Sequence, residues 1–362
     1  MFMTHQKERA KLRAGDRVEV LSKEDILMTL DGRGMVDNLP FMPEMFQFCG
    51  KSFRVFKRAH KTCDPPNGLG GRRMESAVHL EDVRCDGQAH GGCQAGCLIF
   101  WKEVWLKELG PDKGPPDEAR NASPAAGEVR GTKERCTEAA LEAATRVPGE
   151  PASCDNPTYV CQSTWLSLAT KPLPWWGPRQ YWEAWTSGNA RLSDILSAFL
   201  FFLYSHVADA GIGLGTGMRW IYDLFQKARG GTPYPWRTGK LPTGLSTPSS
   251  TLDLQPGEMV KVKSYPDILA TLDENMRNRG MYFDGEMVPF TDKTFRVLTR
   301  VEKIIDEKTG KMMTLKSDAI ILEGVACQGR YSKCRKFCSR GIYPFWREIW
   351  LERKSAENHR AA

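Results

Sequence analysis

The amino-acid sequence predicts an α+β protein in which two homologous, strand-rich modules, each a small barrel, are joined by a linker and a helical insert. Three observations support this prediction. One stretch of the chain occurs twice, each copy contains short segments of alternating apolar and polar residues, and a long helical pattern separates the copies. Alternation is typical of strands, whereas apolar residues three or four apart are typical of helices. A repeated unit is expected to fold around its own core.

The internal repeat begins at Gly15 and again at Gly257, an offset of 242 (257 − 15). This offset continues without a gap to Val55 in the first copy and to Val297 in the second, and both copies end in the motif Phe-Trp-x-Glu. We therefore expect the two copies to superpose as one fold, and the residues that they share to mark what this fold needs.

The composition divides the chain into six parts. A stretch rich in Pro, Gly, Ala and Glu follows the first copy and is typical of a linker. A later segment has the apolar spacing of helices. The predicted parts are a tail at 1–14, module A at 15–109, a linker at 110–173, a helical insert at 174–240, a second linker at 241–256 and module B at 257–354.

Each module opens with the pattern Gly-acid-x-Val-x-Val, which predicts a short strand after a turn. Ser22 and Ser264 then stand where the N-cap of a short helix belongs, with Asp25 and Asp267 three residues later, as in a capping box. The opening pattern resembles that of the SH3-like small barrels. This resemblance implies a small, curled barrel for each module.

The remaining strands are predicted from alternation, at 53–58 and 78–84 in module A and at 295–301 and 319–325 in module B. A hairpin turn is expected between the two module B strands, at 306–311. The motif Phe-Trp-x-Glu is rich in aromatic residues and favours a further strand. One helix is expected in the linker, at 137–145.

Each module contains three cysteines, spaced C-x7-C-x3-C in module A and C-x6-C-x3-C in module B. Each set follows a predicted strand, and its last two cysteines are one helical turn apart, so that three thiolates can converge on one metal ion or cluster. The sequence therefore predicts zinc or an iron–sulfur cluster as the cofactor. The predicted ligands are Cys85, Cys93 and Cys97 in module A and Cys327, Cys334 and Cys338 in module B.

A zinc site needs four ligands, and in module A the fourth could be Cys63, His60, His79 or His90, with Cys63 the best by chemistry. The position that matches Cys63 in module B is Ile305. The site of module B would then have an open position or take a cysteine from the linker. Module A is thus expected to hold a closed, structural site and module B an open one. The linker cysteines are Cys136, Cys154 and Cys161.

Two other interpretations of the cysteines remain open. Reduced cysteines are among the most buried residues, and these thiols could simply fill the cores of the modules. They could also form redox-active disulfides.

Two glutamates, Glu44 and Glu286, also recur at the offset of 242. Recurring glutamates of this kind are usually solvated or paired in salt bridges.

The region around the second cysteine triplet is basic. Four cations there are predicted to lower thiolate pKa values or to bind an anionic ligand or a protein partner. Basic and aromatic residues also interleave at 330–338, so nucleic-acid binding is the alternative function. The matching loop of module A is nearly uncharged. The four cations are Arg330, Lys333, Arg335 and Arg340.

The overall composition is typical of an ordinary globular protein and not of a secreted or membrane protein. The net charge is +7, the hydrophobic fraction is 41%, and the N-terminus has no apolar stretch of the kind found in secretory signals. Eleven cysteines in such a chain are expected to be reduced, as in a cytoplasmic protein. The longest apolar run, 195–204, is shorter than the ~20 residues that span a bilayer, so no membrane protein is expected.

Together these patterns predict an intracellular metalloprotein with an accessory or redox role in a biosynthetic pathway. A nucleic-acid-binding protein and a structural scaffold with inert thiols are the alternatives.

Overall fold

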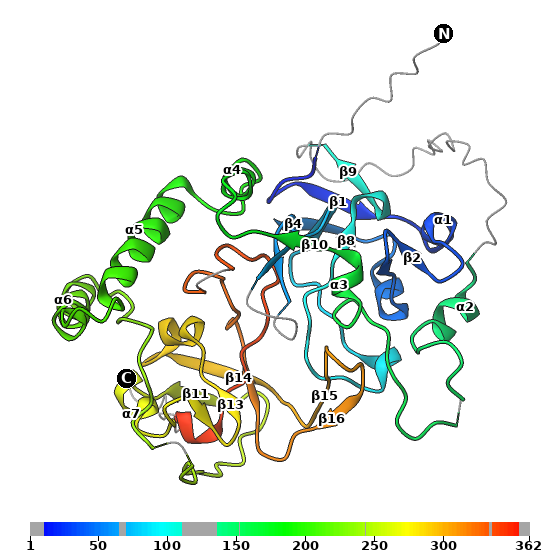
Figure 1. Cartoon of the computed structure of the whole chain (residues 1–362). Helices are drawn as coiled ribbons and strands as arrows, with labels where there is room; N and C mark the ends of the chain where they lie inside the picture. Colours follow the sequence, from blue (N-terminus) through cyan, green and yellow to red (C-terminus); the bar gives the residue numbers. More distant parts are fainter. Residues whose placement is uncertain are drawn as a thin grey trace, which may run out of the picture.

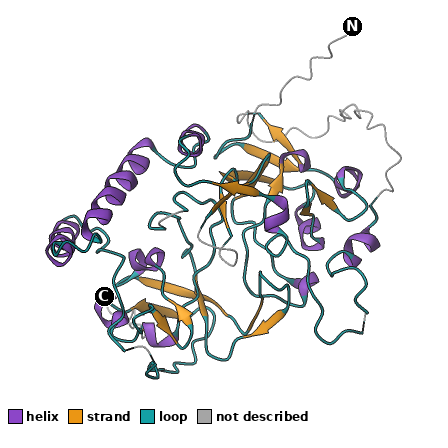
Figure 2. Cartoon of the chain, viewed as in Figure 1, coloured by secondary structure: helices purple, strands orange, loops and turns teal. Residues whose placement is uncertain are grey.

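The computed structural model describes residues 11–64, 70–110, 136–151, 153–242, 244–332 and 335–354. The chain mixes helices with several small antiparallel sheets (Figures 1 and 2). The predicted barrels are wrong, because none of the sheets formed by these residues closes on itself.

The largest sheet has five strands in the order β8-β7-β4-β1-β9 and lies in module A. Its two edge strands follow one another along the chain, and the 3₁₀ helix η4 (Glu103–Trp105) connects β8 (Trp101–Lys102) with β9 (Leu106–Leu109). The edges do not pair with each other, since β8 has two residues and bonds only to β7. The expected Phe-Trp-x-Glu strand is therefore interrupted by a 3₁₀ turn.

Module A also contains the predicted opening strand, its capped helix and strands close to those expected at 53–58 and 78–84, together with short elements that the sequence did not predict. Ser22 caps α1, because its hydroxyl oxygen accepts a hydrogen bond of 3.1 Å from the Asp25 backbone N–H. These elements are β1 (Arg17–Val20), α1 (Lys23–Thr29), β2 (Met35–Val36), β3 (Leu39–Pro40), η1 (Pro43–Phe48), β4 (Ser52–Arg58), β5 (Thr62–Cys63), β6 (Gly71–Arg73), β7 (Ala77–Leu80) and η3 (Gln88–His90).

Module B contains a four-stranded sheet in the order β17-β14-β11-β18 and a hairpin, β15–β16, around the turn expected at 306–311. Ser264 caps α7, as predicted. The elements are β11 (Met259–Val262), α7 (Tyr265–Leu269), β12 (Arg277–Asn278), β13 (Met281–Tyr282), η5 (Gly285–Phe290), β14 (Thr294–Arg300), β15 (Lys303–Ile305), β16 (Met312–Thr314), β17 (Ile320–Leu322), η6 (Glu348–Trp350) and β18 (Leu351–Arg353).

Residues 136–173 pack against module A. The helix expected at 137–145 is confirmed as α2 (Glu138–Ala143), and Leu141 and Leu166 belong to the same hydrophobic core as the β1–β4 strands. Two further elements follow, α3 (Leu166–Ala169) and β10 (Lys171–Leu173), and β10 pairs with β6.

The helical insert connects the two modules. The Arg73 guanidinium of module A forms an ion pair of 2.8 Å with Glu183 in α4, and the Trp236 indole N–H donates to the Tyr331 carbonyl oxygen of module B. Its helices are α4 (Arg179–Thr186), α5 (Leu192–Ala208) and α6 (Gly215–Ala228). None of the described helices is both long enough and apolar enough to cross a membrane.

Each module has a core with two fully buried tryptophans from its closing segment, Trp101 and Trp105 or Trp346 and Trp350. The second tryptophan of each pair donates its indole N–H to a threonine in or just after the first helix of the module. The closing segment is thereby fixed to the first helix, and the cysteine loop between them starts and ends on a rigid frame.

Candidate metal centre

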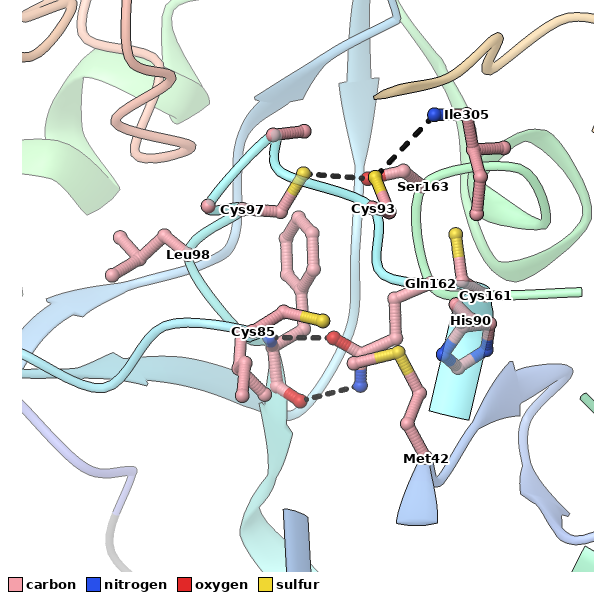
Figure 3. A pocket seen from close by; sticks show the side chains of 14 residues that line it. Met42, Cys85, His90, Cys93, Cys97, Leu98, Cys161, Gln162, Ser163 and Ile305 are labelled. Carbon is pink, nitrogen blue, oxygen red and sulfur yellow. Dashed lines mark hydrogen bonds between the residues drawn. The ribbon is translucent and has the colours of Figure 1, made fainter. Parts of the chain in front are cut away.

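Three cysteines of module A and one cysteine of the 136–173 segment line one cavity, which we call the first cysteine cavity (Figure 3). Its free space is about 30 Å³. Besides these four thiols, it is lined mainly by apolar side chains and by the chain between the cysteines. The four are Cys85, Cys93, Cys97 and Cys161.

Backbone contacts close the loop that carries the three module A cysteines. The Cys85 N–H donates to the Cys97 carbonyl oxygen over 2.9 Å, so that the two ends of the loop meet. Gly87 has φ +70°, and a Cβ atom there would lie 2.1 Å from the Cys93 carbonyl oxygen. Only glycine fits such a close approach, and the turn brings Cys93 back beside the start of the loop.

A buried carboxylate supports the same loop from η1. Glu44 Oε1 accepts a hydrogen bond of 3.1 Å from the Ala89 N–H and lies 2.6 Å from His90 Nδ1. His90 Nε2 lies 3.0 Å from the Val160 carbonyl oxygen. Both ring nitrogens of His90 thus have protein partners, and the ring connects the loop to the segment that carries Cys161.

Gln162 positions the fourth thiol. Its side-chain oxygen accepts from the Phe100 N–H over 2.8 Å, and its amide nitrogen donates to the Phe100 carbonyl oxygen (Figure 3). The same amide nitrogen also donates to the Pro40 carbonyl oxygen. Three bonds from one buried amide fix this turn, and its neighbours Cys161 and Ser163 face the cavity on either side.

Two sulfurs of the cavity accept hydrogen bonds. The Ser163 hydroxyl donates to Cys97 Sγ over 3.5 Å, and the Ile305 N–H of module B donates to Cys93 Sγ over 3.3 Å (Figure 3). Donors aimed at sulfur favour the thiolate and tune a bound metal. Ile305 itself lines the cavity, so the β15–β16 hairpin covers it from module B.

Burial has the opposite effect on the thiols. It raises the pKa of Cys85 and Cys97 and raises the pKa of Cys161 to about 12. These thiols are therefore protonated at neutral pH, and a metal ion would have to displace their protons on binding.

Cys63 does not join this cavity. It lies in β5, where it interacts electrostatically with Cys338 of module B. Cys327 lies close enough to both for electrostatic interaction. Cys334 and Lys333 lie outside the described residues.

The described cysteines are free thiols, and the described His, Cys, Asp and Glu side chains include no group of three or more that could hold a metal ion. Of the histidines weighed as fourth ligands, His79 and His60 each contact a carbonyl oxygen through one ring nitrogen: His79 Nδ1 lies 2.8 Å from the Ile99 oxygen, and His60 Nε2 lies 3.4 Å from the Gln180 oxygen.

The predicted basic surface is only partly exposed. Arg330 is exposed and Arg335 half-buried, whereas Arg340 is buried and its side chain bonds inside the protein. In a nucleic-acid-binding protein, Lys336 would contact a phosphate and Tyr331 a base. Both side chains are buried instead. Part of the pattern that suggested nucleic-acid binding is therefore internal among the described residues.

The sequence did not identify Gln162, the role of Cys161 or the role of the repeated glutamates. Glu286 is buried like Glu44, and its carboxylate accepts from the Tyr331 and Ser332 N–H groups of the module B loop. The recurrence of Glu44 and Glu286 at one offset was the signal that could have revealed a loop-supporting role. Comparisons with protein-family models, with curated proteins and with solved structures found no match to this chain.

Proposed function

We propose that the protein binds a metal ion in the first cysteine cavity through the thiolates of its four cysteines. The observation that supports this proposal is that four thiols from two distant segments line one small buried space. Four thiolates around one ion are a standard zinc site of the closed, structural type. Such a centre would stabilise the fold of module A without taking part in a reaction, which is consistent with an accessory role.

The size of the cavity favours a single ion over a cluster. About 30 Å³ of free space holds one or two water-sized bodies. A four-iron cluster would need the loop to move outward. The donors to Cys93 and Cys97 would offset part of the negative charge that four thiolates place around a divalent ion.

We further propose that modules A and B are two copies of one fold, each with a cysteine loop. Equivalent pairings support this. Arg17 pairs with Arg54 in module A, and Met259 pairs with Arg296 in module B, both at the offset of 242 (259 − 17, 296 − 54). Irregularities in strand register follow Val55 and, at the same offset, Val297.

Metal analysis of the anaerobically purified full chain tests the metal proposal. We expect bound zinc and no visible absorption bands, and we expect Cys161→Ser to lose about one equivalent. Cys154→Ser is the matched control, because Cys154 lies in the same segment but does not line the cavity and should keep the full content.

Visible bands with stoichiometric iron would replace zinc by an iron–sulfur cluster. If the wild-type protein contains no metal and takes up none, the proposal is wrong, and the alternative of a structural scaffold with inert thiols remains.

Glu44→Gln should weaken zinc binding at the first cavity by about 10- to 100-fold, the usual cost of losing a group that orients the ligands. The reason is that the loop would lose the charged acceptor that holds Ala89 and His90. Competition with a chelator measures the affinity. Glu24→Gln, on the exposed side of α1, is the control, and an unchanged affinity in Glu44→Gln would contradict the supporting role.

A further inference from the structure

We infer that module B binds a small phosphate-bearing molecule in a cavity lined by Arg279, Lys316 and Arg347. These residues are not the four cations that the sequence predicted as an anion site. Binding there does not depend on the proposed metal centre, because none of the described cysteines lines this cavity.

In module A the corresponding place holds an ion pair. Lys102, at the third position of the motif Phe-Trp-x-Glu, is 1% exposed, and its Nζ atom lies 2.9 Å from the Asp37 carboxylate. The same Nζ donates to the Glu75 carbonyl oxygen over 3.0 Å. A buried charge is costly unless it is paired, and Asp37 supplies the pair.

In module B the same place holds two cations. Arg347 takes the place of Lys102 in the closing motif. Arg279 takes the place of Asp37 at the offset of 242 (279 − 37), and the two residues share a left-handed backbone, with φ +46° and +49°. The Arg347 guanidinium donates to the Asp318 and Arg279 carbonyl oxygens over 2.8 and 3.0 Å. The turn is therefore kept, while its acid is replaced by a base.

Arg347 forms no ion pair with a carboxylate of the described residues. It is 9% exposed, and its Nε atom has no hydrogen-bond partner in the described part of the chain. The two nearby carboxylates, Asp318 and Glu348, both pair with Arg300 instead. Burial lowers the pKa of Arg347, and the charge of Arg279 lowers it further. An anion bound at this place would supply the charge that Asp37 supplies in module A.

The cavity is polar, rich in positive charge and large enough for a ligand. Its free space is about 200 Å³, against about 30 Å³ in the first cysteine cavity. Arg279 and Lys316 are exposed, whereas Arg347 is buried. Together with Arg300, four cations and two carboxylates surround the space, so positive charge is in excess. Hydroxyl groups complete the polar lining, from Ser249, Ser250, Thr251 and Ser317.

Glu348 fixes the part of the second linker that carries three of these hydroxyls. Its carboxylate accepts from the Leu252 and Leu254 N–H groups over 2.6 and 2.9 Å, directly after Thr251. Arg300 Nη1 lies 2.9 Å from the same carboxylate. This side of the cavity is thus held in place before any ligand binds, which reduces the ordering cost of binding.

The donors around the cavity suit a phosphate group. A guanidinium matches the geometry of phosphate oxygens, and lysine adds a point charge. Several hydroxyl donors can reach the further oxygens of a phosphate, whereas a carboxylate has only two oxygens. The space is below the ~300 Å³ of typical drug-sized sites, so it suits a phosphate with a short molecule attached.

Calorimetric titration of the full chain with inorganic phosphate, at an ionic strength held constant with chloride, tests this inference. We expect one saturable site in the wild type. Arg279→Asp restores the charge pattern of module A and should weaken phosphate binding by about 10- to 100-fold, the usual cost of losing a charged donor. The protein should still fold, because aspartate tolerates the left-handed backbone of this position.

Arg277→Asp is the matched control. It makes the same change of charge two residues earlier on β12, but Arg277 does not line the cavity, so this variant should keep the wild-type affinity. Lys316→Gln changes an exposed side chain and should also lower the affinity for phosphate. If Arg279→Asp does not fold, Lys316→Gln decides, and an unchanged affinity there overturns the site.

Three further outcomes would overturn the inference. They are a wild type without saturable phosphate binding, equal affinity in Arg279→Asp, and acetate binding as tight as phosphate binding. Displacement of phosphate by single-stranded DNA that lacks a terminal phosphate would assign the cavity to nucleic acid and overturn the small-molecule ligand. None of these results bears on the cysteines, so the proposed metal centre stands or falls separately.

Discussion

Replacing Arg340 with leucine is expected to lower the free energy of unfolding by about 3–5 kcal/mol, the usual cost of removing one partner of a buried ion pair. The Arg340 side chain is 3% exposed and pairs with Glu307, which is 24% exposed. Leucine would leave Glu307 without its cation, and the Cys63 carbonyl and Ser163 hydroxyl would each lose a charged donor.

Urea denaturation of the metal-free protein, followed by tryptophan fluorescence, measures this change. Arg330→Leu, at an exposed position in the same module, is the control and should change the free energy by less than about 0.5 kcal/mol. Arg340→Lys should lower the free energy of unfolding by an intermediate amount, because lysine keeps the positive charge but lacks the several N–H donors of a guanidinium. A loss below about 1 kcal/mol in Arg340→Leu would show that the buried network contributes little.

Acid is expected to destabilise the protein through two buried histidines. Burial lowers the pKa of His60 to about 4 and that of His79 to about 3, against about 6.5 in an unfolded chain. Below pH ~6.5 these histidines are protonated in the unfolded chain but stay neutral in the folded protein. The free energy of unfolding therefore falls as the pH drops. The loss between pH 7 and 5 is about 2 kcal/mol for each histidine, and it levels off near each folded pKa.

Unfolding free energies at pH 7, 6 and 5 measure this loss, and His60→Gln and His79→Gln should each reduce the slope whatever their stability at pH 7. NMR titration of the wild type gives a second measurement, in which both rings should stay neutral at pH 5. If one of these histidines titrates near pH ~6.5 in the folded protein, it does not contribute to the acid destabilisation, and the prediction is wrong for that residue.

The sequence by itself determined the features that depend on neighbours along the chain. Ser22 and Ser264 cap their helices because a cap needs only a hydroxyl and a backbone N–H three residues away. The turn at 306–311 forms between its strands for the same local reason. The cysteine spacing also indicated which thiols share a loop.

Only the tertiary structure decided which thiols share a space. Cys161 lines the first cavity beside Gln162, which bonds to the backbone of Phe100. Cys63 lies next to the end of the module B loop because Ser339 and Arg340 donate to the Lys61 and Cys63 carbonyl oxygens. Spacing cannot encode such contacts, since they depend on how the packed modules meet. The burial of Arg340 has the same origin. Arginine is exposed by default, and it is internal here because Glu307 and the chain around both sets of cysteines supply its partners.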